Sequence, residues 1–318
     1  MHKTAILTVF VISIIVIVLL LIKVKKLNSQ LKALQNVLKI VQYSKDIHYH
    51  YSLEDGGRYE FLSRNVDCIF GTGTYDEHVT NPREIYNIVH PEDLPIFKRK
   101  EEGTANFDEP MKYRIRHKDG YYVWLEEHVT PIYNDGKVIS IYGNYRNIST
   151  EMELKEALRY KLIHDSLTDV YNRTYFDELF VTYNEEVDEE IGIIICDLDH
   201  LKQINDVFGH SVGDQYIKDA ASVLKSFENE STYLMRIGGD EFAFFIIRKS
   251  EEEVAKLKKS IKEKLLYFNG VHSIEMSIGY AHVRHSIGQL QMLFELADRY
   301  MYESKNSRST AREDIYAR

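Results

Sequence analysis

The sequence predicts an α+β protein in which two domains of mixed helices and strands follow a long apolar helix. Three observations predict this class. Residues 5–22 form an uncharged apolar run, residues 46–147 hold all five prolines and several strands of period two, and from residue 166 apolar strands alternate with helical segments. A chain of 318 residues is long enough for two or three domains with cores of their own.

The apolar run, residues 5–22, follows a short flank of residues 1–4. As a helix it would be roughly 27 Å long, close to the ~30 Å hydrocarbon core of a bilayer. A cleaved signal peptide would have a shorter apolar region, of about 7–15 residues, and a small-residue cleavage site. We therefore interpret the run as an uncleaved single-pass transmembrane helix. Three lysines at residues 23–26 follow it and only Lys3 precedes it, which predicts the inner membrane with the later domains in the cytoplasm.

The charge of the chain is divided unevenly. The first 45 residues hold seven lysines and no acidic residue, whereas the whole chain has a net charge of −9, so the remainder carries −16. An acidic soluble part argues against a nucleic-acid partner. Cys68 and Cys196 fall in different predicted domains, which predicts reduced cysteines without a disulfide.

Residues 23–45 predict a juxtamembrane helix with a heptad seam. Its apolar residues recur at alternating steps of four and three, at Leu27, Leu31, Leu34, Leu38 and Val41. This spacing favours a parallel pair of helices, a possible coiled coil. A single amphipathic helix packed on the next domain remains the alternative.

Residues 46–147 predict an antiparallel sheet preceded by short helices. The expected strands and turns, in chain order, are Lys112–Arg116, the turn at 117–120, Tyr121–Glu127, Pro131–Tyr133, the turn at 134–136, and Val138–Tyr142.

Four segments of this region resemble a PAS domain, namely Val89–Leu94, Arg114–Gly120, Val123–Glu127 and Gly143–Ser149. The resemblance implies a sensory and dimerising module that regulates the domain after it. Cys68 lacks the Asn-Cys-Arg motif of the flavin-binding members, so we do not expect blue-light chemistry, and the sequence leaves the PAS ligand unknown.

Residues 148–165 predict a helical connector, because no proline or glycine interrupts them. Its apolar positions are Met152, Leu154, Leu158 and Leu162. A stiff helix can transmit a rotation or a change of register from one domain to the next, which a Gly/Ser linker could not do.

Residues 166–318 predict a β-α-β-β-α-β core with additional helices. The expected strands are 191–197, 232–237, 241–248 and 273–282, and the expected helices are 201–208, 213–227, 250–266 and 287–304.

Two acidic pairs mark the predicted site in this region. Asp197 and Asp199 end an apolar strand, and Asp240 and Glu241 follow two glycines that predict a tight turn, since glycine reaches positive φ without steric cost. Glycines also let a ligand approach the backbone. Carboxylates on neighbouring strands suit a divalent cation that carries a phosphorylated substrate.

The same region resembles the GGDEF family, the diguanylate cyclases. The matching segments are Asp165–Thr168 with Asn172 and Arg173, Asp197–Asp214, Gly238–Phe242, Met276–Gly279 and Ala297–Lys305. They cover most of residues 160–310. The resemblance implies that two GTP molecules are joined into cyclic di-GMP with release of two pyrophosphates, by a homodimer in which two such domains face each other.

The resemblance also implies roles for individual residues. Two Mg²⁺ ions would be held by Asp197, the backbone carbonyl of Leu198, and Asp240. Lys202 and Lys305 would meet the phosphates, Gly238 and Gly239 would lie against the substrate, and Asn205 and Asp214 would contact guanine. Asp240 or Glu241 would assist deprotonation of the attacking hydroxyl, and Asp240 ranks first because it also matches a metal ligand.

The sequence departs from the family pattern in two places, and only the second departure supports an alternative function. The Arg-x-x-Asp of the product-inhibition site is replaced by Asn229–Thr232, and the final Lys-x-x-Gly-Arg reads Lys305 to Ser309 with Arg308 in place of the glycine. The alternative is a degenerate domain that binds GTP or cyclic di-GMP and signals without turnover. Arg236 is expected either near phosphate or as an ordinary edge-strand arginine.

Overall fold

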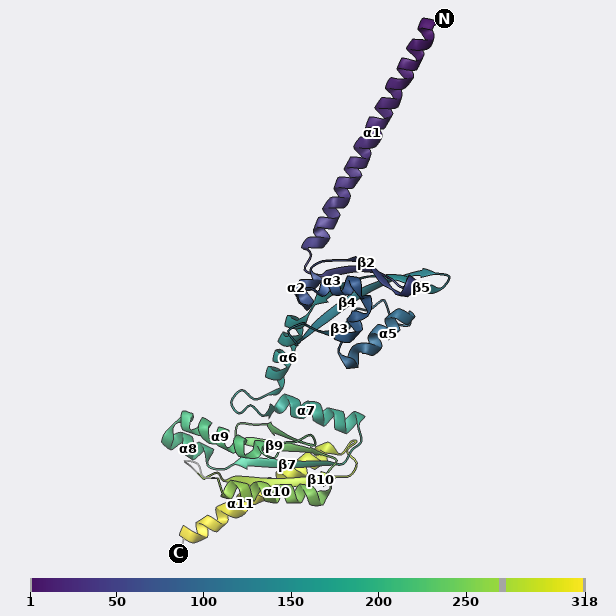
Figure 1. The fold of residues 1–318 in the computed structure, drawn as a ribbon. Coiled ribbons are helices and arrows are strands. Elements are labelled where there is room, and N and C mark those ends of the chain that lie inside the picture. The colour runs from purple at the N-terminus through teal and green to yellow at the C-terminus, as the bar shows by residue number, and fades with distance from the viewer. Residues whose placement is uncertain (1, 269–272, 317–318) are drawn as a thin grey trace. The chain divides into compact units, whose positions relative to one another are not determined.

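The structure of the chain is a computed structural model that describes residues 2–268 and 273–316. For residues 2–15, Gln42, Asp55 and residues 308–316 it describes the backbone alone. The chain divides into two compact units, residues 1–154 and residues 155–318. Each unit is built around its own five-stranded sheet (Figure 1).

The N-terminal unit begins with one helix, α1 (His2–Tyr43), which includes the predicted anchor and the predicted seam. The four leucines of the seam, at residues 27, 31, 34 and 38, are exposed on this helix. Among the residues that the structure describes in full, no helix is both long enough and apolar enough to cross a membrane. Residues 5–15 of the predicted anchor lie outside that set, so the anchor stays a prediction.

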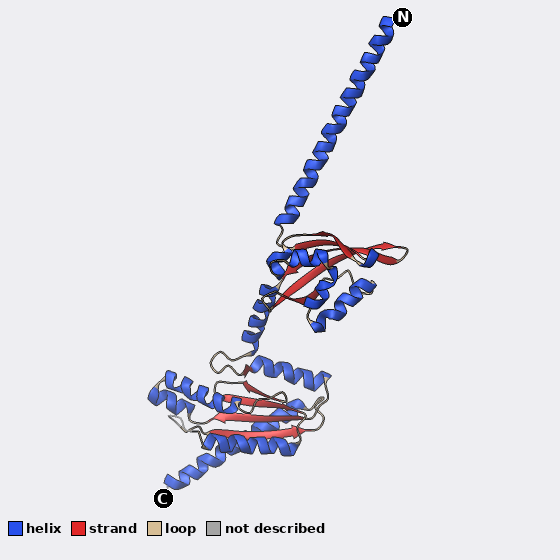
Figure 2. Ribbon diagram, in the orientation of Figure 1, coloured by secondary structure: helices blue, strands red, loops and turns tan. Residues whose placement is uncertain are grey.

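An antiparallel sheet forms the body of this unit, with its strands drawn in red in Figure 2. The strand order is β2-β1-β5-β4-β3. Its strands are β1 (Ile47–Ser52), β2 (Arg58–Leu62), β3 (Met111–Arg116), β4 (Tyr122–Asn134) and β5 (Lys137–Asn147). Between β2 and β3 the chain forms the short helices α2 (Val66–Phe70), α3 (Thr74–Thr80), α4 (Ile85–Ile88) and α5 (Leu94–Glu102). Residues from the sheet and from these helices share one buried core, which includes Phe70, Phe97, Tyr113 and Leu125.

The sheet differs from its prediction in two ways. Two of its strands have no predicted counterpart, and two of the predicted strands form a single strand. β1 and β2 were missed, although Tyr and His alternate along β1 with alternating burial. The segments Tyr121–Glu127 and Pro131–Tyr133 were predicted as separate strands and form the continuous strand β4. Because β3 pairs with β4 only up to Glu127, Pro131 stands where β4 has a free edge, a position at which sheets accommodate proline.

The predicted connector is the helix α6 (Ser149–Ile163). Its start is fixed by side chains, because the backbone N–H of Ser149 donates to Asn147 Oδ1 at 2.9 Å and Ser149 Oγ accepts from the N–H of Trp124 at 2.9 Å. Leu154, Leu158 and Leu162 are exposed along the helix.

The second unit is a five-stranded sheet with strand order β10-β7-β9-β8-β6, in which β6 alone runs parallel to its neighbour. The strands are β6 (Tyr171–Asn172), β7 (Ile191–Leu198), β8 (Thr232–Arg236), β9 (Glu241–Ile247) and β10 (Met276–Val283). The helices are α7 (Arg173–Val181), α8 (Leu201–Phe208), α9 (His210–Lys225), α10 (Glu251–Leu266) and α11 (Leu290–Tyr316), and a short π-helical stretch covers Thr182–Glu186. The predicted β-α-β-β-α-β order is present.

Helices cover both faces of this sheet, which explains why β7 is buried at every position. On one face, apolar residues of α9 and α10 pack against alternate residues of the strands. On the other face, α7 and α11 pack against the remaining residues. A strand covered on both sides reads as a continuous apolar run, and this is how Ile191–Cys196 appears in the sequence.

Candidate active site

The two acidic pairs predicted from the sequence lie at neighbouring ends of two adjacent strands, β7 and β9. β7 and β9 are antiparallel neighbours, and Asp197 stands directly opposite Glu241. One residue further along, the N–H of Leu198 donates to the backbone carbonyl of Asp240 at 2.9 Å. The end of β7 and the turn between β8 and β9 are therefore held together by the main chain, which keeps the carboxylates of the two segments close.

The turn of Gly238 and Gly239 differs from its prediction in one respect. The sequence predicts a positive φ at these glycines, but neither of them adopts a positive φ. Space explains Gly238, since a Cβ atom at this position would lie 2.5 Å from Glu241 Oε2. A Cβ atom at the exposed Gly239 would meet nothing within 4 Å. The turn itself is closed by the N–H groups of Ile237 and Gly238, which donate to the Glu241 carbonyl at 2.9 and 3.3 Å.

Negative charge accumulates at this end of the sheet. Partial burial raises the pKa of Glu241, and three neighbouring carboxylates raise it further, those of Asp197, Asp240 and Asp298. A carboxyl group responds in this way when too few cations balance the charges around it. The site is therefore suited to a cation.

Lys305, on α11, supplies one positive charge. Its Nζ lies 2.6 Å from Asp197 Oδ1, and the Asp197 side chain is almost fully buried. Burial alone would lower the pKa of Lys305, but the hydrogen bond to Asp197 and the charges of Asp197, Asp199 and Asp240 outweigh burial and raise it. This ammonium group occupies the place where a cation would meet Asp197.

The donor set fits Mg²⁺ that arrives with a nucleotide. In the part of the chain that the structure describes, no three His, Cys, Asp or Glu side chains are grouped so as to hold a metal on their own. Mg²⁺ in nucleotide sites takes one or two carboxylates and completes its shell with phosphates and water. Asp197, Asp240 and the carbonyl of Leu198 provide a set of that kind, and the bound ammonium of Lys305 shows that the site stabilises positive charge.

Asp199, the other member of the first acidic pair, is engaged by β10. Ser277, which is fully buried, donates from Oγ to the carboxylate of Asp199 at 3.0 and 3.2 Å. The N–H of Asp199 donates to the Glu275 carbonyl at 2.9 Å. Asp199 thus fixes the chain as it leaves β7, and sequence analysis did not identify Ser277 as its partner.

Arg236 does not lie on an edge strand, because Asn172 of β6 pairs with it, and its expected place near phosphate stays a prediction. Its Nη1 donates to Asp165 Oδ1 at 3.0 Å, and its Nε and Nη2 donate to the carbonyl of Gly239 at 3.2 and 2.7 Å. Burial would raise the pKa of Asp165, but hydrogen bonds from Thr168 and Arg236 lower it. The sequence contained both Asp165 and Arg236 in separate motifs, and only the fold pairs them.

The predicted guanine-binding residues come together on α8 and α9, which pack side by side (Figure 1). Asn205 is half-buried on α8, and its amide lies against Gly213 on α9, next to the exposed Asp214. Lys202 is exposed on the first turn of α8, and His210 is exposed at the start of α9. Arg308, at the altered phosphate contact, lies outside the residues whose side chains are described.

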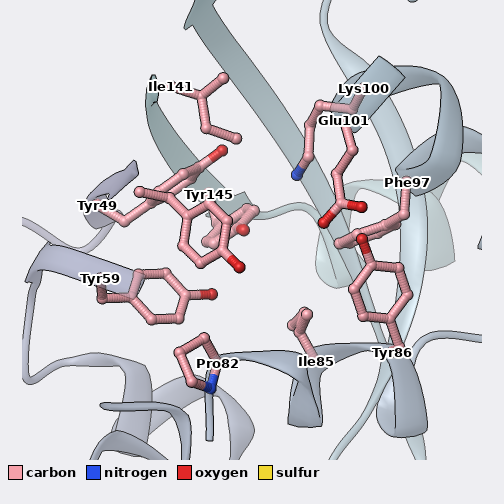
Figure 3. Close-up of a pocket in the computed structure, with 11 residues that line it drawn as sticks. Tyr49, Tyr59, Pro82, Ile85, Tyr86, Phe97, Lys100, Glu101, Ile141 and Tyr145 are labelled. Atoms are coloured by element: carbon pink, nitrogen blue, oxygen red, sulfur yellow. The ribbon is translucent and has the colours of Figure 1, made fainter. Parts of the chain in front are cut away.

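The N-terminal unit contains a small cavity whose lining includes five tyrosines. The polar ends of Tyr59, Tyr145 and Lys100 point toward one space in it (Figure 3). Lys100 Nζ pairs with the buried Glu127 at 3.0 Å, and Tyr49 also donates to Glu127. The cavity volume of about 20 Å³ suits roughly one water molecule.

Comparisons with known proteins find a matching family for part of each unit. Residues 162–311 match the family described as diguanylate cyclase, GGDEF domain, and residues 59–145 match the PAS fold. The chain is 30% identical over 182 residues to the uncharacterized protein YhcK of Bacillus subtilis, covering 54% of this chain and 50% of that protein.

Two Escherichia coli K12 proteins are also similar. The probable diguanylate cyclase DgcT is 30% identical over 151 residues, which are 45% of this chain and 33% of DgcT. The diguanylate cyclase DgcM is 26% identical over 204 residues, which are 62% of this chain and 49% of DgcM. The chain thus spans half or less of the length of these relatives.

Proposed function

We propose that this chain, in which a GGDEF domain follows a PAS fold, is a diguanylate cyclase that joins two GTP molecules into cyclic di-GMP and releases two pyrophosphates. The observation that carries the proposal is the pairing of Asp197 with Glu241 across β7 and β9, with the Leu198 N–H bound to the Asp240 carbonyl. This arrangement gathers carboxylates and a lysine at one strand end, which is what phosphoryl transfer requires.

Asp197, Asp240 and the Leu198 carbonyl would hold Mg²⁺, with two ions expected. When bound, the metal would supply charge neutralisation on the phosphates and polarisation of the attacking hydroxyl. Lys305 would then bind the triphosphate, and Lys202 would approach the phosphates from the first turn of α8. Asp240, with Glu241 beside it, would accept the proton of the 3′-hydroxyl.

Asn205 and Asp214 would read guanine. The base presents N–H donors and a carbonyl acceptor, which a carboxylate and an amide can match. A wrong base leaves those side chains unpaired, and this is how hydrogen-bonding sites discriminate.

The remaining parts of the proposal concern assembly and regulation. One GGDEF domain holds one GTP, so the reaction needs two domains that face each other, and the chain would act as a homodimer. The seam from Leu27 to Val41 and the helix α6 would bring two copies together, residues 5–22 would anchor them in the inner membrane, and the PAS fold would regulate the cyclase in the cytoplasm. These steps rest on the sequence patterns.

The test is incubation of the fragment that starts at Leu27 with GTP and Mg²⁺, followed by chromatography and mass spectrometry for cyclic di-GMP. Product supports a cyclase. Tight GTP or cyclic di-GMP binding without product would favour the degenerate binding module, to which the altered segment Lys305–Ser309 lends its support.

A further inference from the structure

The first turns of α9 contain a glycine, Gly213, and a neighbouring residue occupies the space that a side chain there would need. A Cβ atom at Gly213 would lie 1.9 Å from Asn205 Oδ1, 2.8 Å from its Cγ and 3.3 Å from its Nδ2. Gly213 is buried, so the amide of Asn205 occupies the space that any larger residue would need. We call this space the Gly213 slot.

Helix formation does not explain a glycine at this position. Gly213 has an ordinary helical backbone within α9 (His210–Lys225), where alanine would be the better helix former. Among the described residues, the three atoms nearest to a Cβ atom at residue 213 all belong to the Asn205 amide in the slot.

Close packing of main chains does not explain it either, as a comparison with Gly279 makes clear. A Cβ atom at Gly279 would lie 2.1 Å from the Ala297 carbonyl oxygen and 2.1 Å from the Met301 nitrogen, both in the backbone of α11. Gly279 lets a helix approach a strand. At Gly213 the conflicting atoms belong to the end of a flexible side chain, which can rotate away without unfolding the protein.

We propose that Gly213 is a positioning residue for base specificity, because it seats the Asn205 amide beside Asp214 in the orientation that reads guanine. The inference rests on the proposed function, in which both side chains contact the base. A methyl group at residue 213 turns the amide out of the slot. The domain then keeps its fold and its phosphate contacts, while one of the two groups that recognise the base is lost.

The experiment compares Gly213→Ala, Asn205→Ala and the double variant in the full chain. Non-hydrolysable analogues of GTP and ATP are titrated by calorimetry in the presence of Mg²⁺, and melting temperatures are recorded. We expect Gly213→Ala to melt within a few degrees of the wild type and to bind the GTP analogue about tenfold more weakly, as Asn205→Ala does, since one base contact is lost. Affinity for the ATP analogue should change by less than about twofold, so the preference for guanine falls.

The double variant separates positioning from an independent effect. Because both substitutions remove the same contact, the double variant should bind the GTP analogue as weakly as either single variant, within about twofold. If the loss of affinity in the double variant instead equals the product of the losses in the two single variants, the inference is wrong. Gly279→Ala is the matched control, and it should lower the melting temperature while leaving the ratio of GTP to ATP affinity unchanged.

The remaining outcomes are also decisive. If the wild type prefers guanine and Gly213→Ala keeps that preference, the inference fails and the proposed cyclase stands. If the wild type shows no preference for the GTP analogue, the proposed function fails together with the inference.

Discussion

Arg236 binds Asp165 and the active-site turn at the same time. One guanidinium nitrogen donates to Asp165 Oδ1 at 3.0 Å, and two others hold the Gly239 carbonyl. Asp165 lies two residues after the end of α6, whereas Gly239 belongs to the turn that positions the carboxylates. The segment that follows α6 is therefore linked to the turn of Gly238 and Gly239 through the side chain of Arg236.

Replacement of Arg236 by Ala should affect stability and activity together. The pair is largely buried, with side-chain exposures of 13% and 21%, so its loss is expected to lower the free energy of unfolding by roughly 1–3 kcal/mol. Product formation should fall as well, because the Gly239 carbonyl loses its donors. Urea denaturation and a GTP turnover assay check both effects. Lys259→Ala removes an exposed i,i+4 pair with Glu263 and serves as the control, and an equal loss there would contradict the prediction.

The raised pKa of Glu241 predicts a dependence of stability on pH in the absence of metal. The folded protein favours the protonated form of the Glu241 carboxyl. The contribution of Glu241 to the free energy of unfolding is therefore fully present below its unfolded pKa of about 4.3, and it is lost as the pH rises through the folded pKa. Glu241→Gln cannot ionise, so it should raise the melting temperature at pH 7.5 and leave it unchanged at pH 4. Calorimetry with a chelator present measures both. A rise of equal size at the two pH values would count against charge repulsion as the cause. Glu263→Gln, at an exposed position of α10, is the control.

Lys305 and a divalent metal should compete for Asp197. The ammonium of Lys305 lies 2.6 Å from Asp197 Oδ1, a prospective metal ligand. Lys305→Gln removes this charge, so Mn²⁺ should bind about fivefold more tightly to the nucleotide-free protein, because the repulsion between two unit charges at about 4 Å in water is about 1 kcal/mol. With a GTP analogue present, Lys305→Gln should instead bind Mn²⁺ more weakly, because the triphosphate has lost a cationic contact.

Titration of free Mn²⁺ by electron paramagnetic resonance measures both states of the Lys305 variants. Lys305→Arg keeps the charge and should resemble the wild type. Lys259→Gln removes an exposed lysine on α10 and should change neither value. Unchanged Mn²⁺ affinity in nucleotide-free Lys305→Gln would show that Lys305 does not compete with the metal for Asp197.

Asp240→Ala should abolish cyclic di-GMP formation and leave the fold intact. The main-chain hydrogen bond from Leu198 to the Asp240 carbonyl survives the truncation, so the turn keeps its place while a metal ligand and proton acceptor are removed. Chromatography of the products and a melting curve test this. Near-normal turnover with an unchanged melting temperature would refute the role of Asp240.

Assembly should control the specific activity. The fragment 160–318 should become more active per molecule as its concentration rises, whereas the fragment from Leu27 should resist dilution, because a tether raises the effective concentration to roughly the millimolar range. Leu31→Asp with Leu38→Asp, on the exposed leucines of α1, should make the longer fragment behave like the shorter one. Constant, full activity of the short fragment at nanomolar concentration would exclude the upstream helices as the dimerising elements.

The sequence by itself predicted four of the five strands of the second unit, all but β6, and the acidic residues of its candidate site. The apolar run that ends in Asp197 and the two glycines before Asp240 are local patterns, and burial of β7 on both faces is written in consecutive apolar residues. Helix α10 even carries its own start signal, a capping box between Ser250 and Glu253. Such signals depend on neighbours within a few residues, so they can be read without the fold.

The tertiary structure alone decided which distant groups meet. Asp165 and Arg236, Asp199 and Ser277, and Asn205 and Gly213 are partners across elements, and sheet order and helix packing bring them together. In the N-terminal unit, the sequence missed β1 and divided β4 at Pro131, because proline is tolerated only where a strand edge is free. Edge positions and long-range partners follow from the strand pairing of the whole sheet, and no local pattern carries that information.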